Sequence, residues 1–259
     1  MTIPPLLFAL LMWFVGTAAV VWLDSRPRAT FARSFAWSGI AALASTIAIW
    51  WVAGDTSASG AYIGFAAAIV IWGWHEMGFL MGFVAGPRRT PCPSNARGWQ
   101  RFRLATATVI HHEIALAATA LALFAIGWGQ SNQAAALTFA LLFGMRLSAK
   151  LNLFLGVANL SDEIFPAHLA YLKSYFGAKR ITFFYPVSVA ACALVAAWAW
   201  IAAEAATGGS ATAYTLLAGL AVLGLVEHLF LMLPLRDGAM WRWASAGRKA
   251  TGHPAATVE

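Results

Sequence analysis

Charged residues are scarce in this chain. Asp, Glu, Lys and Arg together make up 10% of its 259 residues, whereas hydrophobic residues make up 61%, and the mean hydropathy is +0.70. Soluble domains carry about 25% charged residues, so this composition excludes an ordinary soluble globular protein. The lipid bilayer is the expected solvent. Each of the ten acids then needs a specific location, because carboxylates are costly in hydrocarbon.

Cysteine is also nearly absent, and this excludes two further classes of protein. The two cysteines, Cys92 and Cys192, lie in a loop and in an apolar run. They indicate neither a disulfide framework nor a cysteine-based zinc site, so both are expected to be free thiols. The net charge of +7 comes from basic residues scattered between apolar runs. It therefore indicates contact with membrane lipids and no nucleic-acid partner.

Long apolar runs are what the sequence has in abundance. A helix needs about 20 residues to cross about 30 Å of hydrocarbon. Seven runs qualify, at residues 6–23, 35–53, 61–85, 104–128, 133–157, 182–203 and 211–233. The first run lacks a basic leader and is expected to be retained as a helix. The seventh contains no Lys for a Schiff base, which disfavours a retinal protein. The predicted fold is an all-α, polytopic membrane helix bundle with about seven transmembrane helices.

The connections between these runs alternate in basicity, which predicts the orientation. Lys and Arg occur in the first, third and fifth connections and in the C-terminal tail, and the other connections have none. We expect the N-terminus to be extracytoplasmic and the C-terminus cytoplasmic. Residues 1–259 are predicted to form a single integral membrane domain. It would include an amphipathic or re-entrant interfacial segment at about 158–180 and a cytoplasmic tail at about 236–259.

Histidines paired with carboxylates are the main functional clue. The groups are His75-Glu76, His111-His112-Glu113, Asp162-Glu163 with His168, and Glu227-His228. Ionisable residues inside a bilayer face the bundle interior or a water-filled cavity and mark functional sites by default. Helical rise places the histidines of the spans in a similar layer in the cytoplasmic half. Arg146 and Lys150, one turn apart, reach that layer and could balance the carboxylates.

Two side-chain stripes predict which helix faces pack inward. Gly78, Gly82 and Gly86 repeat every four residues, a small-residue stripe that permits close helix contact, and His75 shares that face. Thr108, His112 and Thr119 form one polar face on the next span, with His111 and Glu113 pointing away from it.

Three chemistries compete for the cluster. The first is a transition-metal site, such as a di-iron centre. Its candidate ligands are His75, Glu76, His111, His112, Glu113, Glu163, His168, Glu227 and His228. The Glu-x-x-His, HxxxH and HxxHH patterns of known iron proteins are absent. The second is axial ligation of haem or bacteriochlorophyll, with His75, His111, His112 and His228 as candidate cofactor-binding residues. The third is a structural network without a ligand. No catalytic residue can be assigned.

Four longer motifs carry a family resemblance. They read HEMGFLMGFVAGPRRTPCP, TATVIHHEIALA, MRLSAKLNLFLGVANLSDEIFPAHLAYLKSYF and EHLFLMLPL. Together they resemble the PuhE family, photosynthetic complex assembly protein 2 of purple and aerobic anoxygenic phototrophic bacteria. The resemblance implies a bacterial inner-membrane protein associated with the genes for the reaction-centre H subunit. It implies a role in assembly of the photosynthetic apparatus or in bacteriochlorophyll supply, but it supplies no catalytic residues.

Residues and resemblance together give one leading hypothesis and two alternatives. The leading hypothesis is a photosynthetic-complex assembly factor whose polar pocket binds a metal or a pigment. One alternative is a di-iron membrane oxidoreductase acting on a pigment or lipid. The other is a non-catalytic scaffold that packs against reaction-centre or light-harvesting subunits.

Overall fold

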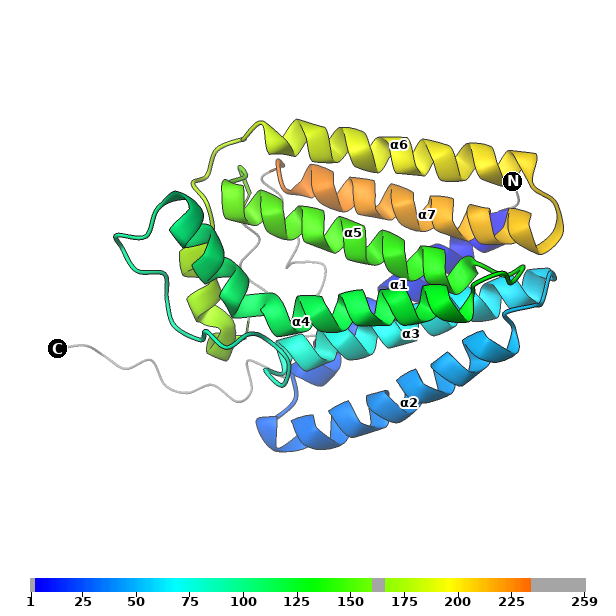
Figure 1. Ribbon diagram of the computed structural model, residues 1–259, viewed down its shortest axis with the longest axis horizontal. Coiled ribbons are helices and arrows are strands. Elements are labelled where there is room, and N and C mark those ends of the chain that lie inside the picture. Colours follow the sequence, from blue (N-terminus) through cyan, green and yellow to red (C-terminus); the bar gives the residue numbers. More distant parts are fainter. Residues whose placement is uncertain (1–2, 160–165, 234–259) are drawn as a thin grey trace.

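The computed structural model describes residues 3–159 and 166–233. Within these ranges the chain is helical and contains no strand (Figure 1). The long helices are α1 (Ile3–Asp24), α2 (Phe31–Trp51), α3 (Ala58–Leu80), α4 (Gly98–Ile126), α5 (Ala134–Leu155), α6 (Phe184–Ala205) and α7 (Gly208–Phe230). Two short 3-10 helices, η1 (Arg28–Thr30) and η2 (Ala167–Tyr175), lie between them.

All seven long helices are long and apolar enough to cross a membrane. The predicted fold class is therefore confirmed, and the protein is a multi-pass membrane protein. In hydrocarbon the backbone must satisfy its own hydrogen bonds, so an apolar run of this length folds as a helix. The predicted orientation and the single-domain organisation stay predictions. Both cysteines are free thiols, as expected.

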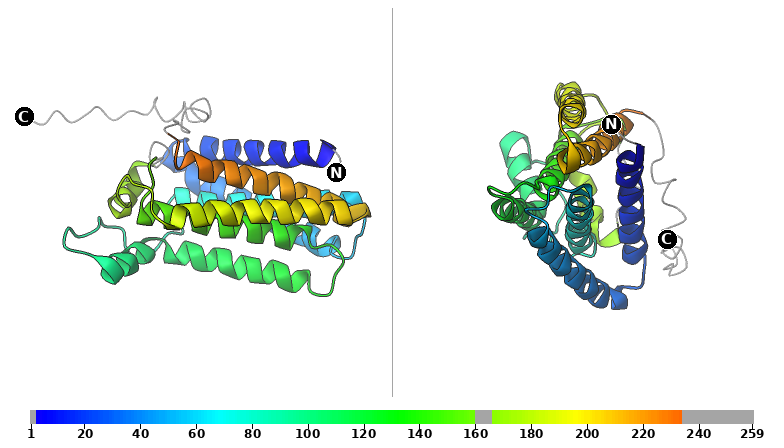
Figure 2. Two further views of the ribbon diagram at one scale, coloured as in Figure 1. Left: turned by 90° about the horizontal axis from the view of Figure 1, so that it is seen from above. Right: turned by 90° about the vertical axis from the view of Figure 1, so that its right-hand side faces the viewer.

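Helix α3 lies at the centre of the bundle. Seen along the bundle, the other helices surround it (Figure 2, right), and it is the most buried of the seven. Phe65 of α3 packs with Leu116 of α4, Phe139 of α5 and Leu216 of α7 in one fully buried core. Helix α2 packs along α3, and α6 packs along α7 at the periphery. The central helix can thus present polar side chains to several neighbours at once.

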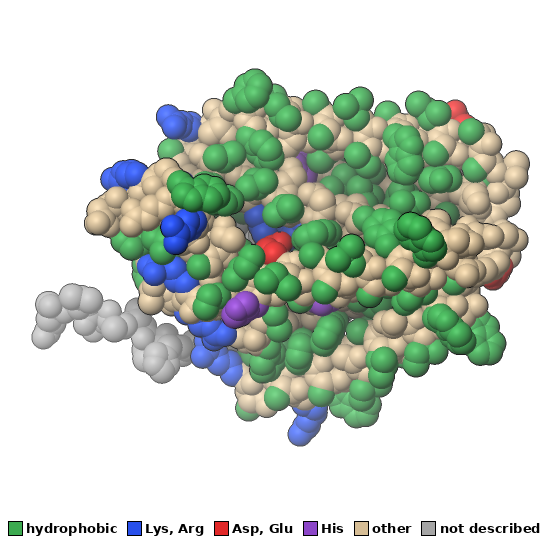
Figure 3. Space-filling model, viewed as in Figure 1, with side chains coloured by type: hydrophobic (Ala, Val, Ile, Leu, Met, Phe, Trp, Pro, Cys, Tyr) green, Lys and Arg blue, Asp and Glu red, His purple; other side chains and the backbone are tan. Residues whose placement is uncertain are grey.

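Basic side chains gather at one end of the bundle (Figure 3). This end, here called the basic end, carries the α1–α2 and α3–α4 connections and the residues around η2. At the opposite end, Asn132 donates from its backbone N–H to Ala53 O and from Nδ2 to Val52 O. Ser57 caps α3 by accepting a hydrogen bond from Gly60 N at 3.1 Å. These hydrogen bonds within and between the loops therefore hold the helix ends in place at this end of the bundle.

Helix α4 is bent where the α3–α4 connection docks against it (Figures 1 and 2). Arg88 N donates to Ala107 O at 3.1 Å, and His112 N donates to Ala85 O at 3.0 Å. These two bonds engage a backbone carbonyl and a backbone N–H of α4. A group that inserts into the hydrogen bonds within a helix bends that helix. Gly86 allows the approach, because a Cβ there would lie 2.2 Å from Ala107 O.

This docking corrects two predictions made from the sequence. The third span was expected to run to residue 85, but α3 ends at Leu80. Gly78, Gly82 and Gly86 consequently do not form one helical stripe. Gly78 faces Phe35 of α2, whereas Gly82 has a φ of 83° and lies beside the His168 ring. The glycine repeat suggested a longer helix. The α3–α4 connection instead leaves the helix after Leu80 and docks its backbone against α4.

The interfacial segment is only partly described. Residues 167–175 form η2, a 3-10 helix within the predicted interfacial segment. Its buried side chains Leu169 and Leu172 pack with Phe79 and Ala85. The ring N–H of His168 donates to Leu80 O at 2.8 Å and so covers the C-terminal end of α3. Asp162, Glu163 and the tail at 236–259 lie outside the described residues.

Candidate functional site

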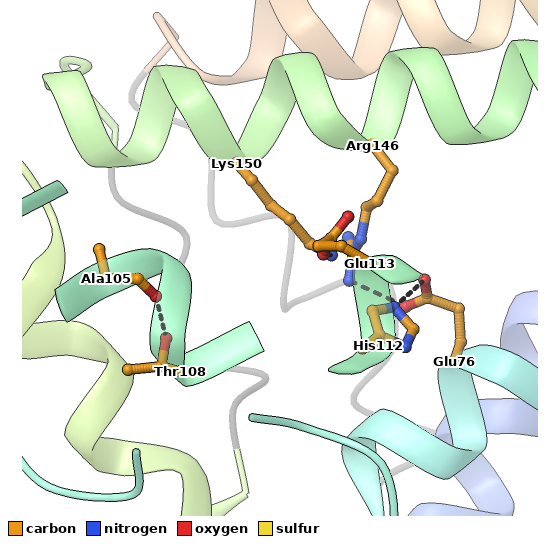
Figure 4. A network of polar contacts seen from close by, with 7 residues as sticks. All are labelled: Glu76, Ala105, Thr108, His112, Glu113, Arg146 and Lys150. Carbon is orange, nitrogen blue, oxygen red and sulfur yellow. Dashed lines mark hydrogen bonds and ion pairs between the residues drawn. The ribbon is translucent and has the colours of Figure 1, made fainter. Parts of the chain in front are cut away.

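Five side chains from three helices meet inside the bundle, and we call them the polar cluster. They are Glu76 of α3, His112 and Glu113 of α4, and Arg146 and Lys150 of α5. Arg146 and Lys150 extend from one helix face toward the two carboxylates (Figure 4). The spacing of four residues on α5 places both cations on the same face, as the sequence predicted.

Two ion pairs organise the polar cluster. Arg146 Nη2 donates to Glu76 Oε2 at 2.9 Å, and Lys150 Nζ donates to Glu113 Oε1. The side chains of Glu76, Glu113 and Lys150 are largely buried, and that of Arg146 is 39% exposed. Two carboxylates facing two cations give a net charge of zero when His112 is neutral. Such pairing offsets the large cost of placing each charge away from water.

His112 lies at the centre of the cluster and is fully buried. Its Nε2 is 3.8 Å from Glu76 Oε1, too far for a hydrogen bond. Its ring packs on Phe79 with centroids 4.8 Å apart, and Lys150 Nζ lies 5.5 Å from the centroid of the same phenyl ring. The aromatic wall excludes water from one side and strengthens electrostatic interactions within the cluster.

Several polar atoms of the cluster have no hydrogen-bond partner among the described residues. They are Glu76 Oε1, both ring nitrogens of His112, Glu113 Oε2 and Arg146 Nε. Buried polar atoms are satisfied in the great majority of cases, so this concentration within one cluster is unusual. The cluster therefore retains both donors and acceptors that could bind a further polar group.

The other predicted histidine sites have separate partners. His75 Nε2 is 2.9 Å from Thr119 Oγ1. His228 Nδ1 donates to Gly224 O at 2.8 Å, so its Nε2 accepts from Ser148 Oγ at 3.1 Å. These contacts join α3 to α4 and α7 to α5, and they engage nitrogens that a ligand would need.

The remaining candidates do not join the polar cluster. His111 is exposed on α4, as its predicted outward position requires. Glu227 is exposed and accepts a hydrogen bond from Trp13 Nε1 of α1 at 3.0 Å. His168 contacts the end of α3, and Glu163 is outside the described residues. Across residues 3–159 and 166–233, no three His, Cys, Asp or Glu side chains are arranged to hold a metal ion.

Asn152 is a buried polar residue that the sequence analysis did not single out. It is fully buried on α5, and its Nδ2 donates to Ser148 O at 3.1 Å and to Ser188 Oγ of α6 at 2.8 Å. The sequence signal that could have identified Asn152 is its side-chain amide within an apolar run, because a polar group in hydrocarbon needs a hydrogen-bond partner. Asn152 and Ser148 extend the polar contacts from α5 to α6 and α7.

The comparisons with known proteins agree with the motifs. Residues 1–251 match a family model described as a protein of unknown function, DUF3623. The chain belongs to this family. A relative from Rhodobacter capsulatus, named "Uncharacterized 30.4 kDa protein in puhA 5'region", is 37% identical over 242 residues, covering 92% of this chain and 88% of its own length. The resemblance expected from the four motifs is thereby confirmed. No solved structure matches the chain.

Proposed function

We propose that this protein is an assembly factor for bacterial photosynthetic complexes that acts within the bacterial inner membrane. The observation that carries the proposal is the name of the Rhodobacter capsulatus relative, which places that protein in the 5′ region of puhA. The family resemblance of the motifs implies the same association with the genes for the reaction-centre H subunit. A bundle of seven apolar helices suits a protein that handles other membrane helices.

Within this role, the polar cluster is proposed to hold the helices in register. Glu76–Arg146 and Glu113–Lys150 join α5 to α3 and to α4, and His228–Ser148 joins α5 to α7. Each pair links residues far apart in the sequence, so a wrong helix rotation would leave charges unpaired. Buried ionic groups can specify one arrangement in this way. The outer helix surfaces would then be fixed for reaction-centre or light-harvesting subunits, the proposed partners.

Genetic replacement tests the proposal directly. The relative's gene would be deleted from Rhodobacter capsulatus, and this chain would be supplied in its place. We expect near-infrared absorption of the reaction centre, measured on isolated membranes per milligram of protein, to fall on deletion and to recover with this chain. Unchanged absorption on deletion, with the other gene products intact, would rule out the assembly role.

A second candidate function is binding of a metal or pigment at His112. The observation favouring it is that both ring nitrogens lack a hydrogen-bond partner and that Glu76 Oε1 lies 3.8 Å away. Either a transition metal or the magnesium of bacteriochlorophyll accepts an imidazole ligand. A di-iron oxidoreductase would additionally need several carboxylate ligands. The two cations beside the carboxylates oppose a second positive ion there.

Elemental analysis and an absorption spectrum separate these functions. The protein would be purified from a phototrophic host and compared with a His112→Ala/His228→Ala variant. Stoichiometric metal or a pigment band that the variant loses would support the ligand-binding function. Substrate-dependent oxygen uptake by an iron-containing protein would support the oxidoreductase. A colourless, metal-free protein would leave the structural role of the cluster as the better account.

A further inference from the structure

A hollow at the basic end is bordered by three arginines. It has a volume of about 590 Å³ and is lined by Arg97, Arg101 and Arg180 together with apolar side chains. None of the three arginines forms an ion pair with an acid among the described residues. Positive charge around an open hollow indicates a site for an anion. The hollow is separate from the polar cluster and shares no residue with it.

The hollow exists because three separate segments converge. Helix α4 begins at Gly98, α5 ends at Leu155, and residues 176–180 return past that end. Gly177 N donates to Leu153 O at 2.8 Å, and a Cβ on Gly177 would lie 2.5 Å from Gly156 N. The close backbone crossing therefore fixes the segment that carries Arg180 against the C-terminal end of α5.

Arg101 is held in place with donors to spare. Its Nη2 donates to Phe154 O at 3.1 Å and to Tyr175 O at 2.6 Å, and its guanidinium lies 4.2 Å from the Phe154 ring centroid. A guanidinium has five N–H donors, and these two bonds leave three. A fixed guanidinium binds a phosphate with little further loss of side-chain entropy.

Apolar surface next to the arginines distinguishes a lipid from a free anion. Leu155 and Phe176 line the hollow itself. Trp99, two residues from Arg97, is 70% exposed, and Phe183, three residues from Arg180, is 87% exposed. Exposed aromatic side chains beside basic residues are typical of the headgroup layer of a membrane. A phosphate at the arginines could therefore extend its acyl chains along neighbouring apolar side chains.

We propose that Arg97, Arg101 and Arg180 bind the phosphate of one anionic phospholipid at the basic end. Arg101 is the fixed donor, and Arg97 and Arg180 close the site from either side. Among the described residues, Arg97 Nη1 donates to the local carbonyls Ser94 O and Ala96 O. The site gives the protein a specific lipid contact, and it does not depend on the proposed function.

Native mass spectrometry of the full chain with added lipids tests the proposal. The probes are dioleoyl phosphatidylglycerol, dioleoyl phosphatidylcholine and inorganic phosphate. We expect one phosphatidylglycerol to be retained in preference to phosphatidylcholine. An Arg97→Gln/Arg180→Gln variant should weaken its retention by about tenfold or more, because each charge-assisted hydrogen bond contributes on the order of a tenfold effect. Arg101 is left intact, because it also fastens α5.

The matched control is Arg28→Gln/Arg33→Gln, which removes the same charge from exposed positions in η1 and α2, away from the hollow. We expect its retention of phosphatidylglycerol to stay within about twofold of the unchanged protein, as for a general surface charge. Equal loss in both variants, or no preference for phosphatidylglycerol, would overturn the proposal. Inorganic phosphate that binds and displaces the lipid at equal concentration would also overturn it, in favour of a free-phosphate site.

Discussion

Glu76 and Arg146 are separated by 70 positions in the sequence and form an ion pair of 2.9 Å between α3 and α5. The second oxygen of the same carboxylate faces the buried ring of His112 on α4. Glu76 on the central helix α3 therefore faces side chains of both α4 and α5. This relationship makes Glu76 the residue on which the geometry of the polar cluster depends most.

Replacement of Glu76 by Gln should destabilise the bundle. The change leaves the Arg146 guanidinium without its carboxylate, and we expect a loss of about 2 kcal/mol, below the range for fully buried pairs because Arg146 is partly exposed. Thermal unfolding in detergent measures the effect. Glu204→Gln removes an exposed acid of α6 as the control and should change stability by less than about 0.5 kcal/mol. Equal stability of Glu76→Gln and Glu204→Gln would contradict the role of the pair.

Glu113 and Lys150 should behave as a coupled pair. Glu113→Gln and Lys150→Met each leave one charge of this buried pair without its partner, whereas the double variant removes both charges. In a double-mutant cycle, we expect the double variant to lose about 1–3 kcal/mol less free energy of unfolding than the two single variants lose together. Denaturant unfolding of the four proteins gives this coupling. Strictly additive effects would show that the two side chains do not interact in the membrane protein.

Loss of the Ser148 hydroxyl should destabilise the protein, because His228 then loses its hydrogen-bond donor on α5. The Nδ1–H of His228 is engaged by Gly224 O, so its Nε2 needs the hydroxyl as a donor. We expect Ser148→Ala to cost about 1 kcal/mol, the usual value for a hydrogen bond between membrane helices. Ser38→Ala is the control, because the Ser38 hydroxyl donates to Phe35 O within its own helix. Imidazole ¹⁵N NMR showing the proton on Nε2 would contradict this arrangement.

Gly86 should tolerate no side chain, in contrast to Gly144. A Cβ at position 86 would lie within 2.2 Å of Ala107 O and would push the α3–α4 connection off α4. A Cβ at position 144 meets nothing within 4 Å, and alanine is favoured over glycine in a helix by about 1 kcal/mol. Gly86→Ala should therefore reduce the yield of monodisperse protein in size-exclusion chromatography, and Gly144→Ala should not. Similar yields would show that the docking is not required.

Much of the candidate site was predictable from residue type and spacing. Arg146 and Lys150 were expected to balance carboxylates because they lie one turn apart in an apolar run, and both do so. A polar face of Thr108, His112 and Thr119 was likewise expected. Thr108 and His112 are buried, and Thr119 contacts His75. The convergence of all the histidines was not found. His75 and His228 are both buried, but each contacts a hydroxyl group, Thr119 or Ser148.

The sequence by itself determined the seven helices and their approximate bounds. The run predicted at 133–157, for example, is α5 at Ala134–Leu155. Apolar side chains and the need to satisfy every backbone group in hydrocarbon fix that outcome locally. Only the tertiary structure decided which charges pair and where α3 ends. Those features depend on helix rotation and on contacts such as Ala85–His112, and no local residue pattern encodes the distance between two helices.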